Sequence, residues 1–290
     1  MVDQIVPARG LAIEHEGHRT RLKWHRLRRS LADPLFSAEA MSQGFRLGAS
    51  MELDLRVRGD GGFVVLHDEV LEGETTGRGE IARLSRRDME TARLRDGRAL
   101  VFSEDLAALL AAAHPEAILQ FDMKDDLAVI GAAGMRHLAE QFSDLPCPVI
   151  VSGHDLDLIV AVKRLLPNLR RGIDPTDKLV ARIEREGWDG VADDLVRDVE
   201  GPTEPDTVYL HWQLVLQAAA RDLDLIALCH ARGAKVDAWT FTLADPTGFS
   251  DAEWHDFSAL LALRPDQITT DEAVATERAF QARTAAARPR

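Results

Sequence analysis

The sequence predicts a TIM (β/α)8 barrel with a small insertion after its second strand. Short runs rich in β-branched and aromatic residues alternate with Ala/Leu-rich stretches, a rhythm typical of a parallel sheet closed by helices. The chain has 290 residues, of which 46% are hydrophobic, enough for one large α/β domain or two ordinary ones. Because eight candidate strands fit into this length, we expect a single barrel domain that spans residues 1–290.

The expected elements alternate along the chain. Strands are expected at Leu22–Arg26, Ala49–Leu55, Ala117–Met123, Pro148–Ser152, Leu169–Ile173, Thr207–Leu210, Lys235–Thr240 and Asp266–Thr269. Helices are expected at Ser37–Leu47, Asp125–Phe142, Leu156–Leu165, Asp177–Glu186 and Trp212–Arg232. The tail from about residue 276 to 290 is charged and Ala-rich, which predicts a last helix that frays into disorder.

One short run breaks this rhythm and predicts the insertion. Phe63–Leu66 follows the second strand after Gly59-Asp60-Gly61-Gly62, a tight-turn signature. Parallel strands need a crossover of about a dozen residues, so this run should pair with the second strand as an antiparallel hairpin. We therefore expect residues 59 to about 103 to project from the C-terminal mouth of the barrel, where the active sites of TIM barrels are built.

Composition excludes several classes of function. The net charge of −13 argues against binding to nucleic acid or to an anionic membrane surface, although it allows a local basic pocket. The N-terminus has no signal pattern and no apolar run approaches a membrane span, so we expect a cytoplasmic protein without stable membrane association. Cys147 and Cys229 lack metal-ligand spacing and are expected to be buried apolar residues.

The acidic pair Glu52 and Asp54 is the most informative motif. Side chains two apart on a strand lie on the same face, so these two carboxylates point together and repel each other. A divalent metal would hold them, because carboxylate oxygens suit Mg²⁺, Ca²⁺ or Mn²⁺. Taken alone, the motif fits equally well a half-buried edge strand with its polar face in water.

Polar residues at the ends of other expected strands favour the metal site. The residues that would converge on one barrel mouth are His25, Arg26, Glu52, Asp54, His67, Asp122 and Lys124. This set offers three anionic ligands, two groups that move protons near neutral pH and two cations, which suits hydrolysis of a phosphodiester.

Several further residues near strand ends could line the same pocket. His211 and Trp239 are interpreted as pocket residues, whereas His154 and Trp212 fit the core or the surface at least as well. The pair Asp193-Asp194 is interpreted as a solvated loop rather than a second metal site.

In the order and spacing of these motifs, the sequence resembles the glycerophosphodiester phosphodiesterase family. The family's motifs appear in order as His25-Arg26-Leu27, Glu52-Leu53-Asp54, Asp60-Gly61 with His67-Asp68, Asp122-Met123-Lys124, Trp239-Thr240 and Thr270-Asp271. Each motif is short, but their order and spacing together cover the chain from about residue 20 to 273.

The resemblance implies both a fold and an activity. It implies a TIM barrel and a divalent cation, Mg²⁺ or Ca²⁺, held by Glu52, Asp54 and Asp122. His25 and His67 would form the general acid/base pair. We interpret His25 as the base and His67 as the acid, and the reverse assignment also remains open. Arg26 and Lys124 would bind the phosphate of a glycerophosphodiester, which would be hydrolysed to an alcohol and sn-glycerol 3-phosphate. Attack by water and attack by a neighbouring substrate hydroxyl both remain open.

The chain departs from the family pattern in four places. Leu27 replaces a glycine and would add bulk beside the phosphate site, and Asp33-Pro34-Leu35-Phe36 replaces a P-E-N-T segment. Asp122 stands where Glu is usual, and Thr242 where Asn is usual. These changes motivate two alternatives: the same chemistry on a sugar or opine phosphodiester or a lysophospholipid, or a barrel that binds phosphorylated ligands without turnover.

Overall fold

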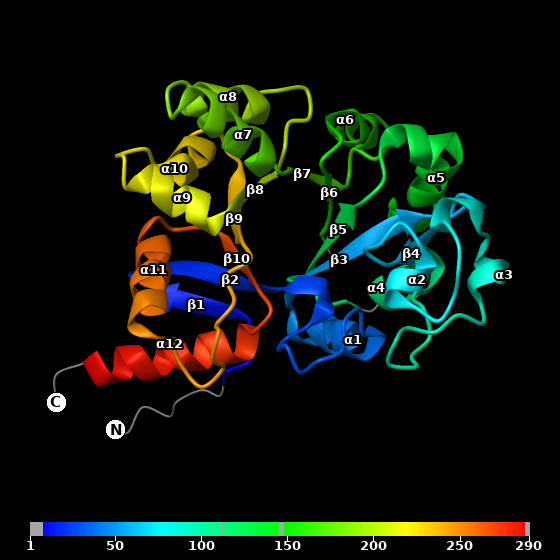
Figure 1. The fold of residues 1–290 in the computed structure, drawn as a ribbon, viewed down its shortest axis with the longest axis horizontal. Helices are drawn as coiled ribbons and strands as arrows, with labels where there is room; N and C mark the ends of the chain where they lie inside the picture. The colour runs from blue at the N-terminus through cyan, green and yellow to red at the C-terminus, as the bar shows by residue number, and fades with distance from the viewer. Residues whose placement is uncertain (1–7, 112, 145–147, 288–290) are drawn as a thin grey trace.

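The computed structural model describes residues 8–111, 113–144 and 148–287, and shows a closed parallel barrel surrounded by helices (Figure 1). Eight parallel strands run side by side in the order β2-β10-β9-β8-β7-β6-β5-β3, and pairing between β2 and β3 closes the ring. The predicted TIM barrel is therefore confirmed. The strands are β2 (His18–Trp24), β3 (Ser50–Val57), β5 (Ile118–Met123), β6 (Val149–Gly153), β7 (Arg170–Ile173), β8 (Thr207–His211), β9 (Lys235–Trp239) and β10 (Gln267–Thr270).

The helices cover the outside of the barrel because their apolar faces pack on the outward-facing side chains of the strands. They are α1 (Ala38–Leu47), α5 (Leu127–Phe142), α6 (Leu156–Leu165), α7 (Thr176–Glu186), α8 (Val191–Val199), α9 (Trp212–Ala219), α10 (Leu225–His230), α11 (Asp251–Ala262) and α12 (Ala273–Ala287). None of the helices in the described ranges combines the length and the hydrophobicity needed to cross a bilayer.

The insertion after the second barrel strand has the predicted antiparallel start. β4 (Phe63–Val65) pairs with β3 in an antiparallel register that places Val65 opposite Leu55. The segment continues through α2 (Leu71–Glu74), the 3-10 turn η2 (Ile81–Arg83) and α3 (Arg86–Met89), and returns to the barrel at α4 (Ser103–Leu110). A small apolar core of its own, which includes Val64, Leu71, Met89 and Phe102, holds it together.

Several predicted elements differ in the structure. The single helix expected at 212–232 is two helices, because Asp222 adopts a left-handed φ of 59° and Asp224 then caps α10 by accepting from the Ala227 amide. Sequence patterns missed β1 (Ala12–His15), which pairs antiparallel with β2, and also α8 and α11. The pair Asp193-Asp194 lies in the first turn of α8 rather than in a loop. Cys229 is buried as expected, whereas Cys147 and residues 288–290 lie outside the described residues.

The first barrel strand ends at Trp24, two residues earlier than predicted. His25–Leu27 forms the 3-10 turn η1, in which Arg26 and Leu27 take positive φ values of 49° and 61°. A left-handed conformation costs about 1–2 kcal/mol for a residue with a Cβ atom. The Leu27 side chain is fully buried in the main core, and this burial helps to stabilise the turn.

The barrel interior is polar near its C-terminal mouth. Lys23 and Asp237 form an ion pair of 2.8 Å between Nζ and Oδ2, and both side chains are almost completely buried. Thr269 donates to Asp237 over 2.7 Å, and the Lys23 ammonium lies 4.4 Å from the centre of the Tyr209 ring. Buried charges are stable in pairs because each satisfies the other in a medium that screens poorly.

We therefore expect Lys23→Met to lower the free energy of unfolding by about 3–5 kcal/mol, since Asp237 would remain buried without its partner. The double variant Lys23→Met/Asp237→Leu should recover part of this loss, because it removes the unpaired charge although Gln120 Oε1 still lacks its Lys23 donor. Urea denaturation followed by circular dichroism measures both. A double variant no more stable than Lys23→Met would show that the ion pair is not what holds these side chains.

Candidate active site

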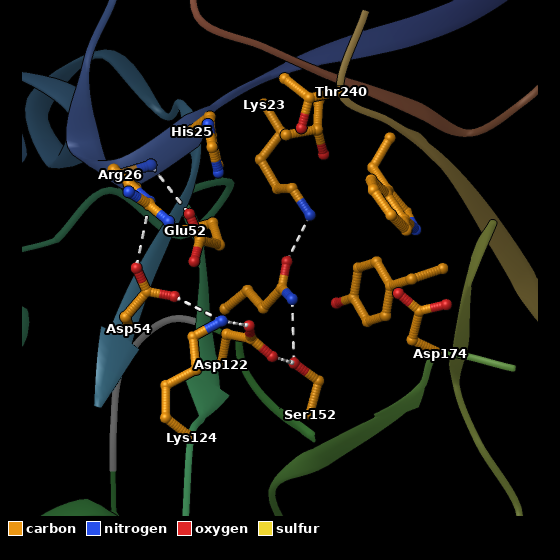
Figure 2. A pocket seen from close by; sticks show the side chains of 14 residues that line it. Lys23, His25, Arg26, Glu52, Asp54, Asp122, Lys124, Ser152, Asp174 and Thr240 are labelled. Atoms are coloured by element: carbon orange, nitrogen blue, oxygen red, sulfur yellow. Dashed lines mark hydrogen bonds and ion pairs between the residues drawn. The ribbon is translucent and has the colours of Figure 1, made fainter. Parts of the chain in front are cut away.

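A pocket of about 310 Å³ opens at the C-terminal ends of the barrel strands (Figure 2). Its lining comes from strands around the ring and from the segments that follow them. The lining residues are Lys23, His25, Arg26, Glu52, Asp54, Gln120, Asp122, Lys124, Ser152, Asp174, Tyr209, Trp239, Thr240 and Thr269. The pocket lies where the sequence predicted an active site, and most of the predicted site residues line it.

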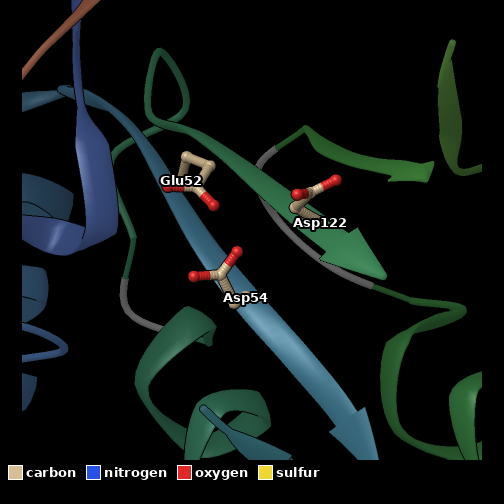
Figure 3. Close-up of side chains that lie close together, drawn as sticks. All are labelled: Glu52, Asp54 and Asp122. Carbon is tan, nitrogen blue, oxygen red and sulfur yellow. The ribbon is translucent and has the colours of Figure 1, made fainter. Parts of the chain in front are cut away.

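Three carboxylates that line this pocket lie close together (Figure 3). Glu52 and Asp54 share the inner face of β3, and the register of β3 with β5 places Asp122 directly opposite Asp54. Each of the three offers an oxygen within 4.8 Å of the other two. Glu52 and Asp54 are buried, whereas Asp122 is partly exposed. The alternative of an edge strand with its polar face in water is wrong, because β3 pairs on both sides and both carboxylates face the barrel interior.

The acidic cluster changes the protonation of Glu52. Burial raises its pKa most, and the neighbouring charges of Asp54 and Asp122 raise it further. His25 and a hydrogen bond from the Arg26 amide to Glu52 Oε2, 2.8 Å long, act in the opposite direction. The net result is a pKa of about 7. Near neutral pH, Glu52 can therefore lose its proton when another positive charge binds beside it.

Two cations lie against the carboxylates. Lys124 Nζ is 2.5 Å from Asp122 Oδ2 and 2.9 Å from Asp54 Oδ1 (Figure 2). Burial alone would lower the pKa of the Lys124 ammonium, but the charges of Asp122 and Asp54 outweigh it and raise the pKa. Arg26 Nε lies 3.2 Å from Asp54 Oδ2, yet neither atom forms a hydrogen bond although both are buried. Both predicted phosphate-binding residues therefore border the acidic cluster.

His25 is held by Asp271, a residue of the Thr270-Asp271 motif to which the sequence analysis assigned no function. Its Nδ1 lies 2.9 Å from Asp271 Oδ1, and Arg28 Nη2 contacts the same oxygen at 2.6 Å. Burial would raise the pKa of Asp271, but the hydrogen bonds and charges of His25 and Arg28 lower it to about 2. Thr242, at a position where the resemblance suggested Asn, donates to Asp271 Oδ2 over 3.2 Å. Asp271 is thus an anion that fixes the imidazole.

The other predicted histidines lie farther out. His67 follows β4 at the start of the insertion, does not line the described pocket and is 40% exposed, with Nδ1 3.2 Å from Asp68 Oδ1. Arg56 links it to the pocket rim by donating to the main-chain oxygens of both His67 and Lys124. His211 ends β8 and packs edge-to-face on the pocket residue Trp239, with ring centres 4.7 Å apart.

The remaining candidates lie away from the chemistry. The Leu27 side chain points into the core and does not line the described pocket, so the added bulk expected beside the phosphate site is not there. Asp194 forms ion pairs with Arg182 and Arg197. His154 pairs with Asp126 at the surface, and Trp212 packs on Phe241.

Comparisons with solved structures identify the fold of this chain. No known protein family and no curated protein matches the sequence. Among solved structures, a glycerophosphodiester phosphodiesterase from Thermotoga maritima matches with a TM-score of 0.61 and 20% identity, over 91% of this chain and 99% of that one. This chain shares its fold with glycerophosphodiester phosphodiesterases.

Two further solved structures have the same fold as this chain. A phosphodiesterase from Oleispira antarctica, in complex with its product sn-glycerol-3-phosphate, matches with a TM-score of 0.63 and 17% identity over 90% of this chain and 96% of that one. A glycerophosphodiester phosphodiesterase from Parabacteroides distasonis matches with a TM-score of 0.63 and 16% identity over 92% and 99%. At these identities the likeness establishes the barrel fold of the chain.

The raised pKa of Glu52 makes the stability of the metal-free protein depend on pH. The folded protein holds this proton more tightly than the unfolded chain, so the free energy of unfolding should fall as the pH rises from about 4.5 to about 7. Glu52→Gln removes this loss and should stabilise the metal-free protein at pH 8 by up to about 3 kcal/mol, with little effect at pH 4.5. Urea denaturation at both pH values is the measurement. Equal stability of the two proteins at pH 8 would contradict it.

Proposed function

We propose that this protein hydrolyses a glycerophosphodiester to an alcohol and sn-glycerol 3-phosphate with the help of a divalent cation, Mg²⁺ or Ca²⁺. The observation that carries this proposal is the convergence of Glu52, Asp54 and Asp122 in one pocket beside His25. The fold shared with phosphodiesterases, one of them solved with sn-glycerol-3-phosphate, supports it.

The donor set of the pocket fits a hard divalent cation. Three carboxylates carry more negative charge than Arg26 and Lys124 neutralise, and oxygen ligands are those that Mg²⁺ and Ca²⁺ prefer. Asp54 Oδ2 is buried without a hydrogen bond, as expected of an atom that serves as a ligand. Glu52, Asp54 and Asp122 would hold the cation. When bound, it supplies a Lewis acid that stabilises negative charge on the phosphoryl group.

The two histidines would move the protons. Asp271 is anionic and can only accept a hydrogen bond, so His25 carries a proton on Nδ1 and leaves Nε2 of the neutral ring as the base. Nε2 would take the proton of the attacking oxygen, while Asp271 stabilises the imidazolium that forms. His67 lies on the insertion, joined to the pocket residue Lys124 through Arg56, and would protonate the departing alcohol oxygen.

Arg26 and Lys124 would neutralise the phosphate. Both cations contact Asp54 and lie at the border of the pocket, so a phosphoryl oxygen could replace a carboxylate as their partner. Trp239, braced by the His211 ring, would line the part of the pocket that receives an alcohol portion of the substrate.

The direct test is turnover of glycerophosphocholine with Mg²⁺ or Ca²⁺ and with EDTA. Wild-type protein should release glycerol phosphate only with the cation, and His25→Ala should lower kcat by about 10²–10⁴-fold without weakening cation binding. His154→Ala, which removes a surface histidine paired with Asp126, is the matched control and should keep full activity.

Other outcomes of this assay would contradict the assignment of the base or favour an alternative function. Full activity in His25→Ala would sink the assignment of the base. Turnover of bis(p-nitrophenyl) phosphate alone would favour a different phosphodiester substrate, and no turnover of either would favour a barrel that only binds phosphorylated ligands. Phosphorus NMR of the products distinguishes attack by a substrate hydroxyl, which yields a cyclic phosphate, from attack by water.

Asp271→Asn tests the pairing with His25 separately. An amide can donate its N–H to His25 Nδ1 and favour the wrong tautomer, so kcat should fall at least about tenfold while the Kd for the cation stays unchanged. Asp266→Asn is the control, because Asp266 forms the same kind of pair with His230 outside the pocket, 2.8 Å apart. If kcat is equally low in both variants, the loss reflects general damage to the barrel.

A further inference from the structure

A chain of hydrogen bonds crosses the barrel interior and ends on Asp122 (Figure 2). It starts at Lys23 on β2, whose ammonium donates to Gln120 Oε1 on β5. Gln120 Nε2 donates to Ser152 Oγ on β6 over 2.9 Å. Ser152 Oγ in turn lies 3.2 Å from Asp122 Oδ1. Neither the proton transfers nor the phosphate contacts proposed above use the first three of these residues.

The direction of this chain follows from the chemistry of its first member. An ammonium group has donors only, so Gln120 must turn its amide oxygen toward Lys23 and its NH₂ toward Ser152. That NH₂ occupies a lone pair of the Ser152 hydroxyl. The hydroxyl must then send its own proton away from Gln120, toward Asp122 Oδ1 or toward the Phe121 carbonyl, 3.3 Å away.

The start of the chain is fixed. Lys23 is held by Asp237 at 2.8 Å, and Asp237 is held by Thr269 at 2.7 Å. Only 2% of Lys23, 6% of Gln120 and 1% of Ser152 is exposed to solvent. Because a buried donor or acceptor that loses its partner costs about 1–3 kcal/mol, no member can turn away without a penalty.

The end of the chain needs such support. Asp122 is 28% exposed, and Lys124, the partner of its other oxygen, is a long side chain that is itself 22% exposed. Ser152 is therefore the buried and rigid contact that limits rotation of the Asp122 carboxylate. A bond to Oδ1 fixes the rotation of the Asp122 carboxylate, and with it the direction of its lone pairs, within the cluster that it forms with Glu52 and Asp54.

We propose that Lys23, Gln120 and Ser152 are positioning residues that orient the Asp122 carboxylate for the divalent cation. This inference rests on the proposed metal site and extends it to residues that would not touch the cation. Hydrogen bonds to ligating groups from such outer residues are worth about 10–100-fold in metal affinity.

The test is isothermal titration calorimetry of the full chain with Mg²⁺ and with Ca²⁺. Ser152→Ala and Gln120→Met should each raise the Kd by about tenfold or more, and Ser152→Thr, which keeps the hydroxyl, should restore the wild-type Kd. Ser50→Ala is the matched control. This variant removes a buried hydroxyl that donates to Gln267 Oε1 in the same barrel interior and that has no contact with Asp122. The Kd of Ser50→Ala for the cation should therefore equal that of the wild-type protein.

Each outcome decides a different question. An unchanged Kd in Gln120→Met and Ser152→Ala would overturn the inference, and so would an equal rise in Ser50→Ala, which would indicate general loosening of the barrel. Failure of the wild-type protein to bind either cation would overturn the proposed metal site and this inference with it. Gln120→Met keeps the side-chain volume and carries the test if Ser152→Ala does not fold.

Discussion

The mutual repulsion of three carboxylates, held within 4.8 Å of one another, is the constraint on which the pocket depends. The side-chain alternation of β3 and its register with β5 fix their positions, so the backbone cannot relieve the repulsion. It is relieved instead by charge. Glu52 holds its proton up to a pKa of about 7, and Arg26 and Lys124 approach the two aspartates. A divalent cation would satisfy the same oxygens in one step, which is why the arrangement suits metal-assisted chemistry.

The strained turn after β2 serves this arrangement. Two consecutive residues with Cβ atoms, Arg26 and Leu27, are in the left-handed region, and backbone strain of this kind persists only where the surroundings determine it. Here the turn directs the Arg26 amide to Glu52 and places His25 against Asp271. The burial of Leu27 offsets part of the strain. A position where the resemblance suggested glycine is thus filled by a core residue in a left-handed conformation, which glycine adopts most readily.

The sequence was sufficient for the barrel, the hairpin and the acidic cluster, because period-two alternation and motif order determine them. It could not reveal features that depend on distant partners. The Asp271 contact joins residues 246 positions apart, and the chain from Lys23 to Asp122 passes through inward-facing polar residues that no motif marks. The break between α9 and α10 depends on one left-handed aspartate inside an Ala/Leu-rich run. Local patterns favour a continuous helix there.

Anomalous diffraction from crystals soaked in MnCl₂ tests the central claim most directly, since it locates the cation without any assumption about substrate. We expect one strong peak in the pocket with oxygens of Glu52, Asp54 and Asp122 about 2.0–2.6 Å away, and the Lys124 ammonium displaced from Asp122. A peak elsewhere, or none in the pocket while Lys124 still bridges Asp54 and Asp122, would contradict the account.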